Sequence, residues 1–94
     1  MAEEEEWTKV PVEEVCRVCG LYAEGALWDE YGAPQYLTCP CCGVESGLGD
    51  ASYEMVTWNR ARWLESGAEW QEPEFRPTNW SLEEQLACIP AKWR

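Results

Sequence analysis

Four cysteines in two Cys-x-x-Cys-Gly motifs are the residues of this sequence best suited to chemistry. Cys16 and Cys19 form the first pair, Cys39 and Cys42 form the second, and a glycine follows each pair. This spacing is typical of four-thiolate metal sites, most often zinc sites. The glycine permits a tight turn that lets backbone N–H groups approach the sulfurs. Because the sequence has no histidine, we predict a structural Zn²⁺ site made by these four cysteines.

The other two cysteines, Cys41 and Cys88, are predicted not to bind the metal. A ligand set that used Cys41 would lose both the two-residue spacing and the following glycine. Cys88 is expected to be a small buried residue on a C-terminal helix. A thioredoxin-like dithiol is a poorer interpretation, because it needs a single Cys-x-x-Cys at a strand-to-helix junction. Reduced, metal-bound thiolates are expected rather than disulfides, since no export signal is recognisable.

The same composition argues against catalysis. Without histidine there is no common general base, and neither a Ser-His-Asp nor a Cys-His set can form. A zinc ion with four cysteine ligands has no open position for water or substrate. The carboxylate pairs Asp29–Glu30 and Glu83–Glu84 are interpreted as solvated surface. We therefore expect a protein that is not an enzyme.

A strongly acidic charge limits the kinds of partner. The formal net charge of the 94 residues is −11, and four thiolates with one Zn²⁺ would take it to about −13. Such a chain would be repelled by nucleic-acid backbones and by anionic membranes, so neither is an expected partner. A basic protein surface is the natural complement.

The ends and apolar stretches of the chain indicate its location. No stretch is long and apolar enough to span a bilayer. The start, Met1-Ala2-Glu3-Glu4-Glu5-Glu6, is the opposite of a basic-then-apolar signal peptide. A cytoplasmic protein is expected, with residues 1–10 as a flexible acidic arm.

Residues 11–94 are predicted to form a single small α+β domain. The part at 11–50 is expected to be a four-cysteine zinc ribbon with short β-hairpins. A short strand would lead into the first knuckle, meaning the loop formed by a Cys-x-x-Cys-Gly motif, and a hairpin would lie between the knuckles over 21–38. The part at 51–94 is expected to add two short α-helices that pack on the ribbon. With few aliphatic residues and seven tryptophans, the core must depend on indole rings.

Sequence periodicity and capping residues predict both helices. In the first, Tyr53, Val56, Trp63 and Leu64 share one face, and Gly67 is a suitable stop. Arg60 interrupts this apolar face unless its side chain extends to the surface or stacks on an indole.

The second helix begins with a capping-box pattern at Ser81–Glu84. Leu82, Leu86 and Ile89 form its apolar face, and Pro90 ends it.

Exposed tryptophans among carboxylates are the candidate partner-binding residues. Helical geometry places Trp58 on the charged face of the first helix, beside Glu54 and Glu65. Trp7, in the acidic arm, and Trp93, near the C-terminus, are also poorly placed for a core. Such a surface suits docking onto a basic protein with an apolar pocket.

The two knuckles also support an alternative with iron. The segments 16–22 and 39–43 resemble the two knuckles of rubredoxins, including the tyrosine at position 22. That resemblance implies a one-electron carrier with a four-thiolate iron. Four thiolates alone do not distinguish iron from zinc.

A second resemblance covers residues 16–90. The segments 36–47, 63–68 and 79–86 are similar to those of small bacterial cysteine-rich CPCC proteins, some of which lie beside toxins. The resemblance implies an immunity protein that binds and neutralises a cognate toxin. An acidic inhibitor would complement a toxin with a basic active cleft. A zinc-ribbon adaptor in a larger assembly, such as a transcription complex, is the remaining alternative.

Overall fold

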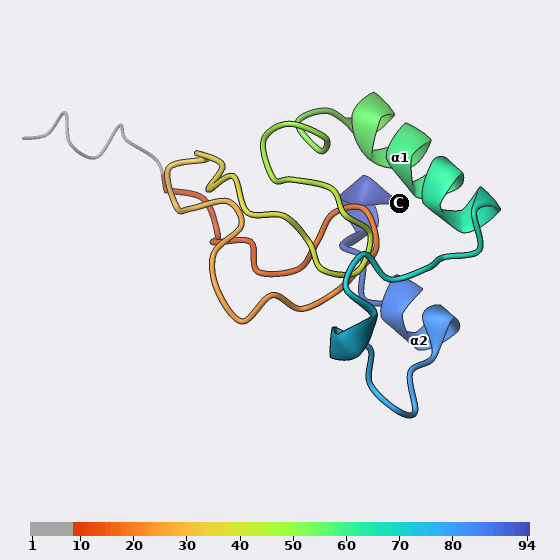
Figure 1. Ribbon diagram of the computed structural model, residues 1–94. Coiled ribbons are helices and arrows are strands. Elements are labelled where there is room, and N and C mark those ends of the chain that lie inside the picture. The colour runs from red at the N-terminus through yellow and green to blue at the C-terminus, as the bar shows by residue number, and fades with distance from the viewer. Residues whose placement is uncertain (1–8) are drawn as a thin grey trace, which may run out of the picture.

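The computed structural model describes residues 9–94 and contains two α-helices and two short 3-10 turns. In chain order these are α1 (Tyr53–Glu65), η2 (Pro73–Phe75), α2 (Leu82–Leu86) and η3 (Ala91–Trp93). Residues before α1 form irregular loops that lie on one side of the molecule (Figure 1). The helices and the C-terminus lie on the other side.

The β-hairpins expected for a zinc ribbon are not present in residues 9–94. Antiparallel pairing is limited to isolated bridges, which join Glu13 to Trp28, Val15 to Tyr22, Trp28 to Pro34 and Thr38 to Glu45. The loop between the knuckles turns at Asp29, whose carboxylate accepts hydrogen bonds from two backbone N–H groups downstream. Prolines and the turns of the knuckles interrupt the paired segments, so no bridge is extended into a strand. The predicted α+β class is therefore correct in its helices and wrong in its strands.

Helix α1 forms where the sequence predicted it. The Ser52 side chain accepts a hydrogen bond from the Met55 N–H at 3.2 Å and caps the first turn. Val56 and Trp63 are buried, as expected. Tyr53 and Leu64 were expected on the same buried face but are exposed, so α1 contacts the core along a narrow stripe.

Helix α2 is shorter than its apolar pattern suggested. Ser81 accepts a hydrogen bond from the Glu84 N–H at 3.2 Å, which agrees with the predicted N-cap. The helix ends at Leu86, and Ile89 is buried from the turn that follows. Because the helix does not continue, Cys88 is exposed and the prediction of a buried Cys88 is wrong.

The core consists mainly of sulfur atoms and indole rings. Trp63 and Trp70 are buried, and the Trp70 and Trp80 rings meet edge to face with their centroids 5.7 Å apart. Val18 and Val56 are the buried aliphatic residues with no exposed surface. The expectation that indoles would supply the core is correct for these two tryptophans, with Trp80 half-buried against them.

The structure bears on the expectation that no segment spans a membrane, but it does not bear on the expected acidic arm. Within residues 9–94, α1 and the other helices are too short and too polar to cross a bilayer. The predicted acidic arm lies almost wholly in residues 1–8, outside the described part of the chain.

Candidate metal centre

Two knuckles with the same backbone hydrogen bonds hold the four candidate ligands. In the first, the Gly20 N–H donates to the Cys16 carbonyl at 2.9 Å, and the Cys16 N–H donates to the Leu21 carbonyl at 2.8 Å. The second knuckle repeats both bonds through Cys39, Gly43 and Val44 at 2.9 Å. The glycines adopt positive φ angles of 89° and 81°, which a residue with a Cβ rarely adopts. The glycine after each cysteine pair is therefore required by backbone geometry.

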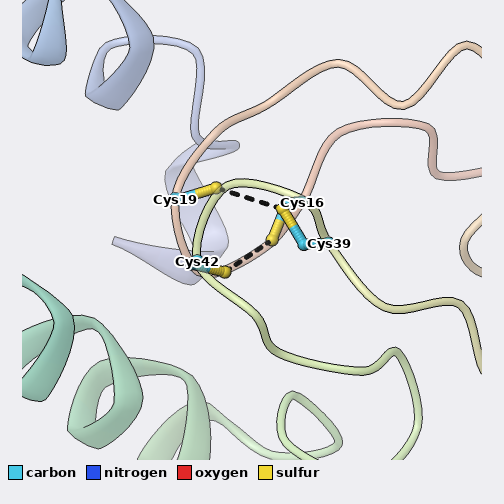
Figure 2. A group of neighbouring side chains, drawn as sticks. All are labelled: Cys16, Cys19, Cys39 and Cys42. Atoms are coloured by element: carbon cyan, nitrogen blue, oxygen red, sulfur yellow. Dashed lines mark hydrogen bonds between the residues drawn. The ribbon is translucent and has the colours of Figure 1, made fainter. Parts of the chain in front are cut away.

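The four sulfurs lie at the separations that a tetrahedral metal site needs. All four Sγ atoms are within 4.8 Å of one another. The Cys16–Cys42 and Cys19–Cys39 contacts between the knuckles measure 3.7 and 3.6 Å (Figure 2). Tetrahedral zinc with Zn–S bonds of about 2.3 Å requires S···S distances of about 3.8 Å. A disulfide would require about 2.05 Å, and all six cysteines are free thiols. The donor set fits a metal such as zinc.

Crowding of the sulfurs makes their protonation unequal. Hydrogen bonds from the thiols of Cys16, Cys19 and Cys42 hold the pKa of Cys39 well below its ordinary value. Hydrogen bonding with Cys16, followed by the other neighbouring sulfurs and by burial, raises the pKa of Cys19. The pKa of Cys42 is raised chiefly by Cys16. A cluster of this kind therefore holds one thiolate, which the neighbouring thiols stabilise. Further thiolates require a cation that neutralises their negative charge.

Cys41 is buried beside this cluster but is held by the protein. The Gln85 side chain donates from Nε2 to the Cys41 Sγ at 3.3 Å and to the Cys19 carbonyl at 3.1 Å. Its Oε1 accepts from the Trp80 indole at 2.7 Å. Hydrogen bonding from Cys19 lowers the pKa of Cys41, with a further contribution from Gln85. The sulfur of Cys41 thus has a fixed partner outside the ligand set.

The C-terminal half satisfies the carbonyl groups of the first knuckle. Arg60 donates to the carbonyls of Val18 and Arg17, each at 2.7 Å, and to the carbonyl of Trp93 at 2.6 Å. Burial lowers the pKa of Arg60, but a guanidinium remains charged throughout the physiological range. The position of Arg60 within the apolar face of α1 was the sequence signal for this role.

The backbone carbonyl groups of the second knuckle accept hydrogen bonds from the segment that precedes η2. The N–H groups of Gln71 and Glu72 donate to the carbonyls of Cys41 and Pro40, both at 2.9 Å. No sequence pattern indicated these two residues or Gln85. Buried carbonyls need partners, but the sequence does not show which distant segment supplies them.

Arg17, the residue after Cys16, links the first knuckle to both ends of the domain. Its guanidinium lies between the rings of Trp28 and Trp93, at 3.8 and 4.0 Å from their centroids. It also forms a bidentate ion pair with Glu13 at 2.7 and 2.8 Å. Such stacking and forked pairing are specific to arginine. No sequence pattern indicated this role.

The candidate partner-binding residues take different positions. Trp58 is 60% exposed, and Glu54 and Glu65 on the same helix are exposed too. Trp93 is half-buried against the core, contrary to the expectation that it would lie outside. Trp7 lies outside the described residues.

No protein-family model, curated protein or solved structure matches this chain.

Proposed function

We propose that this chain is a non-enzymatic zinc protein in which the metal has a structural role. The observation that carries this proposal is the set of four sulfurs within 4.8 Å, held by two knuckles of the same geometry. Four protein ligands complete the preferred coordination of zinc and leave no position for substrate. Because segments far apart in the sequence meet at the knuckles, metal binding contributes directly to folding.

Metal analysis of the purified protein tests this proposal. We expect one zinc per chain, colourless protein and loss of the α-helical circular dichroism when a strong chelator removes the metal. A red protein with visible charge-transfer bands would instead establish the rubredoxin-like iron centre. Retention of fold and full thermal stability after complete metal removal would contradict a structural role.

The proposal extends to a protein partner with a basic surface. All seven Lys and Arg residues lie in the described part of the chain. Within residues 9–94, Arg17–Glu13 is the one ion pair, and the other cations contact aromatic rings or backbone carbonyls. The other carboxylates of this part of the chain therefore have no ion-pair partner within it. An uncompensated acidic surface favours encounter with a basic protein.

We further propose, from the resemblance to CPCC proteins, that the partner is a cognate bacterial toxin and that binding neutralises it. The test is co-expression with the protein encoded immediately upstream, scored by co-purification and by growth. An affinity tag belongs at the N-terminus, because the carbonyl of Arg94 accepts a hydrogen bond from Tyr53. Complex formation with rescued growth is expected. Absence of both would reject the toxin and leave the adaptor alternative.

The exposed face of α1 supplies the first variants for mapping that complex. Trp58→Ala, and Glu54→Gln with Glu65→Gln, remove its indole and its charges. Losses of roughly tenfold or more in affinity are expected for a contact at the centre of an interface. Unchanged affinity would place the partner on another face.

A further inference from the structure

A cleft of about 560 Å³ opens beside the metal centre and is lined by both knuckles and by η2. Two candidate metal ligands, Cys16 and Cys39, are buried members of its lining, together with Leu27 and Trp70. We call these buried residues the floor. Tyr22, Leu37 and Phe75 are the large exposed side chains of the lining.

The charges around this cleft have one sign. Apart from cysteine and tyrosine, Glu24 is the ionisable residue of the lining, and it is exposed. Hydrogen bonding with Glu14 and the charge of Glu14 raise the pKa of Tyr22, and the charge of Glu24 makes the smallest contribution. A zinc ion with four thiolates carries a formal charge of about −2, so the floor would be anionic as well. Anionic groups within an apolar rim favour a cation that carries its own apolar surface.

Cations of this chain already stack on aromatic rings elsewhere. Arg17 lies over Trp28 and Trp93, Arg62 lies over Trp58, and Arg76 lies over Trp80. Lysines stack on Tyr31 and Trp93.

The aromatic residues of the cleft are not among these rings, and neither are Tyr36, Tyr53 and Trp63. Within residues 9–94 no cation stacks on Tyr22, Trp70 or Phe75, although Arg76 directly follows Phe75 in the chain. The cleft thus offers aromatic surface and negative charge without an internal cation.

We propose that this cleft binds an arginine side chain of the protein partner. A guanidinium is planar, weakly hydrated and able to stack on aromatic faces, so it suits the cleft better than an ammonium group does. It would lie among Tyr22, Phe75 and Trp70 with Glu24 at the rim. This proposal specifies the contact for the basic partner and rests on the proposed function in that respect.

The test uses a capped peptide, Gly-Gly-Arg-Gly-Gly, titrated into the ¹⁵N-labelled, zinc-loaded full chain. Peptides with lysine or citrulline in place of arginine are the matched controls. Shifts are expected in the amides of Tyr22, Leu37 and Phe75 and in the indole N–H of Trp70. The expected affinity order is arginine, then lysine, then citrulline. Equal shifts with citrulline, or shifts confined to Trp58, would overturn the proposal.

Variants of exposed cleft residues provide a second test. Phe75→Ala and Glu24→Gln should each weaken arginine-peptide binding by roughly three- to tenfold. Leu48→Ala, at an exposed position outside the cleft, should leave it unchanged. Zinc content and melting temperature verify that each variant is folded. Unweakened binding in both cleft variants would reject the site.

Measurements with the protein partner distinguish failure of the arginine site from failure of the proposed function. A complex that forms normally with Phe75→Ala and Glu24→Gln removes the arginine site and leaves the basic-partner proposal intact. Failure to form any complex with wild-type protein removes the partner, while the peptide titration still decides whether the cleft binds arginine.

Discussion

At the scale of single residues, Cys41 and Cys42 show that neighbouring cysteines have distinct roles. The Cys42 sulfur lies 3.7 Å from that of Cys16, within the ligand set. The Cys41 sulfur accepts a hydrogen bond from Gln85. Backbone direction at the knuckle, rather than the chemistry of the thiol, decides which sulfur can reach the metal.

Serine substitutions distinguish the two classes of cysteine. Cys39→Ser should weaken zinc binding by roughly a hundredfold or more, because a neutral hydroxyl replaces a thiolate ligand. Cys41→Ser should retain one zinc and lose about 1 kcal/mol of unfolding free energy, since only a buried hydrogen bond changes. Competition with a chromogenic chelator measures the affinity. Equal zinc loss in both variants would contradict the assignment of Cys41.

A second prediction concerns the guanidinium of Arg17. Arg17→Met should lower the free energy of unfolding by about 3 kcal/mol, because it leaves the half-buried Glu13 carboxylate without its ion pair. Arg17→Lys should fall between methionine and wild type, since it keeps charge but loses the fork and the stacking. Denaturant unfolding of zinc-loaded protein measures both. A wild-type midpoint for Arg17→Met would show that the contacts contribute nothing to stability.

At the scale of elements, α2 and the first knuckle are packed without space for an additional methyl group. A Cβ built on Gly20 would overlap the Gln85 carbonyl oxygen and would lie 3.2 Å from Ile89. Gly20 therefore satisfies two requirements, a positive φ for the knuckle and close approach of the last α-helix. Helix α2 is attached to the metal centre through this contact and the Gln85 side chain.

Gly20→Ala should destabilise the zinc-loaded protein by about 3 kcal/mol or more, because backbone strain and steric overlap add together. Gly25→Ala is the matched control, since a Cβ there meets nothing within 4 Å. Its effect should remain within about 0.5 kcal/mol. Melting temperatures at saturating zinc measure both, and similar values for the two variants would refute the predicted overlap.

Sequence patterns predicted features that depend on neighbours along the chain. The candidate ligand set and the α2 cap follow from spacing and local hydrogen bonding, so the sequence predicted both. The predicted strands are not found in residues 9–94, because strand pairing depends on how far two segments stay in register around prolines and knuckles. Trp93 was expected outside the core because its partner, Arg17, is brought to it only by the fold. Gln85 was missed for the same reason.

At the scale of the whole molecule, the cations of residues 9–94 contact aromatic rings and backbone carbonyls more than they contact carboxylates. Arg60 and Arg94 donate to backbone carbonyls, and Arg62 and Arg76 cover indole rings. Ion pairs within this part of the chain therefore compensate little of the net charge of −11. A largely uncompensated charge agrees with the proposed basic partner.

Acid should release the metal and unfold the protein. Metal-bound cysteines have folded-state pKa values below those of the unfolded chain, so their stabilisation is present at neutral pH and is lost as pH falls. In the absence of metal the pKa values of Cys19 and Cys42 are raised while that of Cys39 is lowered. Because Cys39 already favours the thiolate, zinc binding at pH 7 should release fewer than four protons.

An indicator dye in weakly buffered solution counts the protons, and circular dichroism follows the acid transition. Release of four protons would contradict a preformed thiolate at Cys39. A fold and zinc content unchanged down to pH 3 would contradict metal-linked stability.

The contacts of the first knuckle with the end of the chain have a consequence for biosynthesis. Gln85 reaches the Cys19 carbonyl across 66 residues, and Trp93 completes the stack on Arg17. Both contacts join the beginning of the described chain to residues that are translated much later. The nascent chain can hold zinc as soon as Cys42 has emerged, but the Cys19 carbonyl obtains its partner only after Gln85, and the stack on Arg17 is complete only after Trp93. The first knuckle is thus fully packed only once these distant residues have emerged, by long-range contacts of the slowly forming kind.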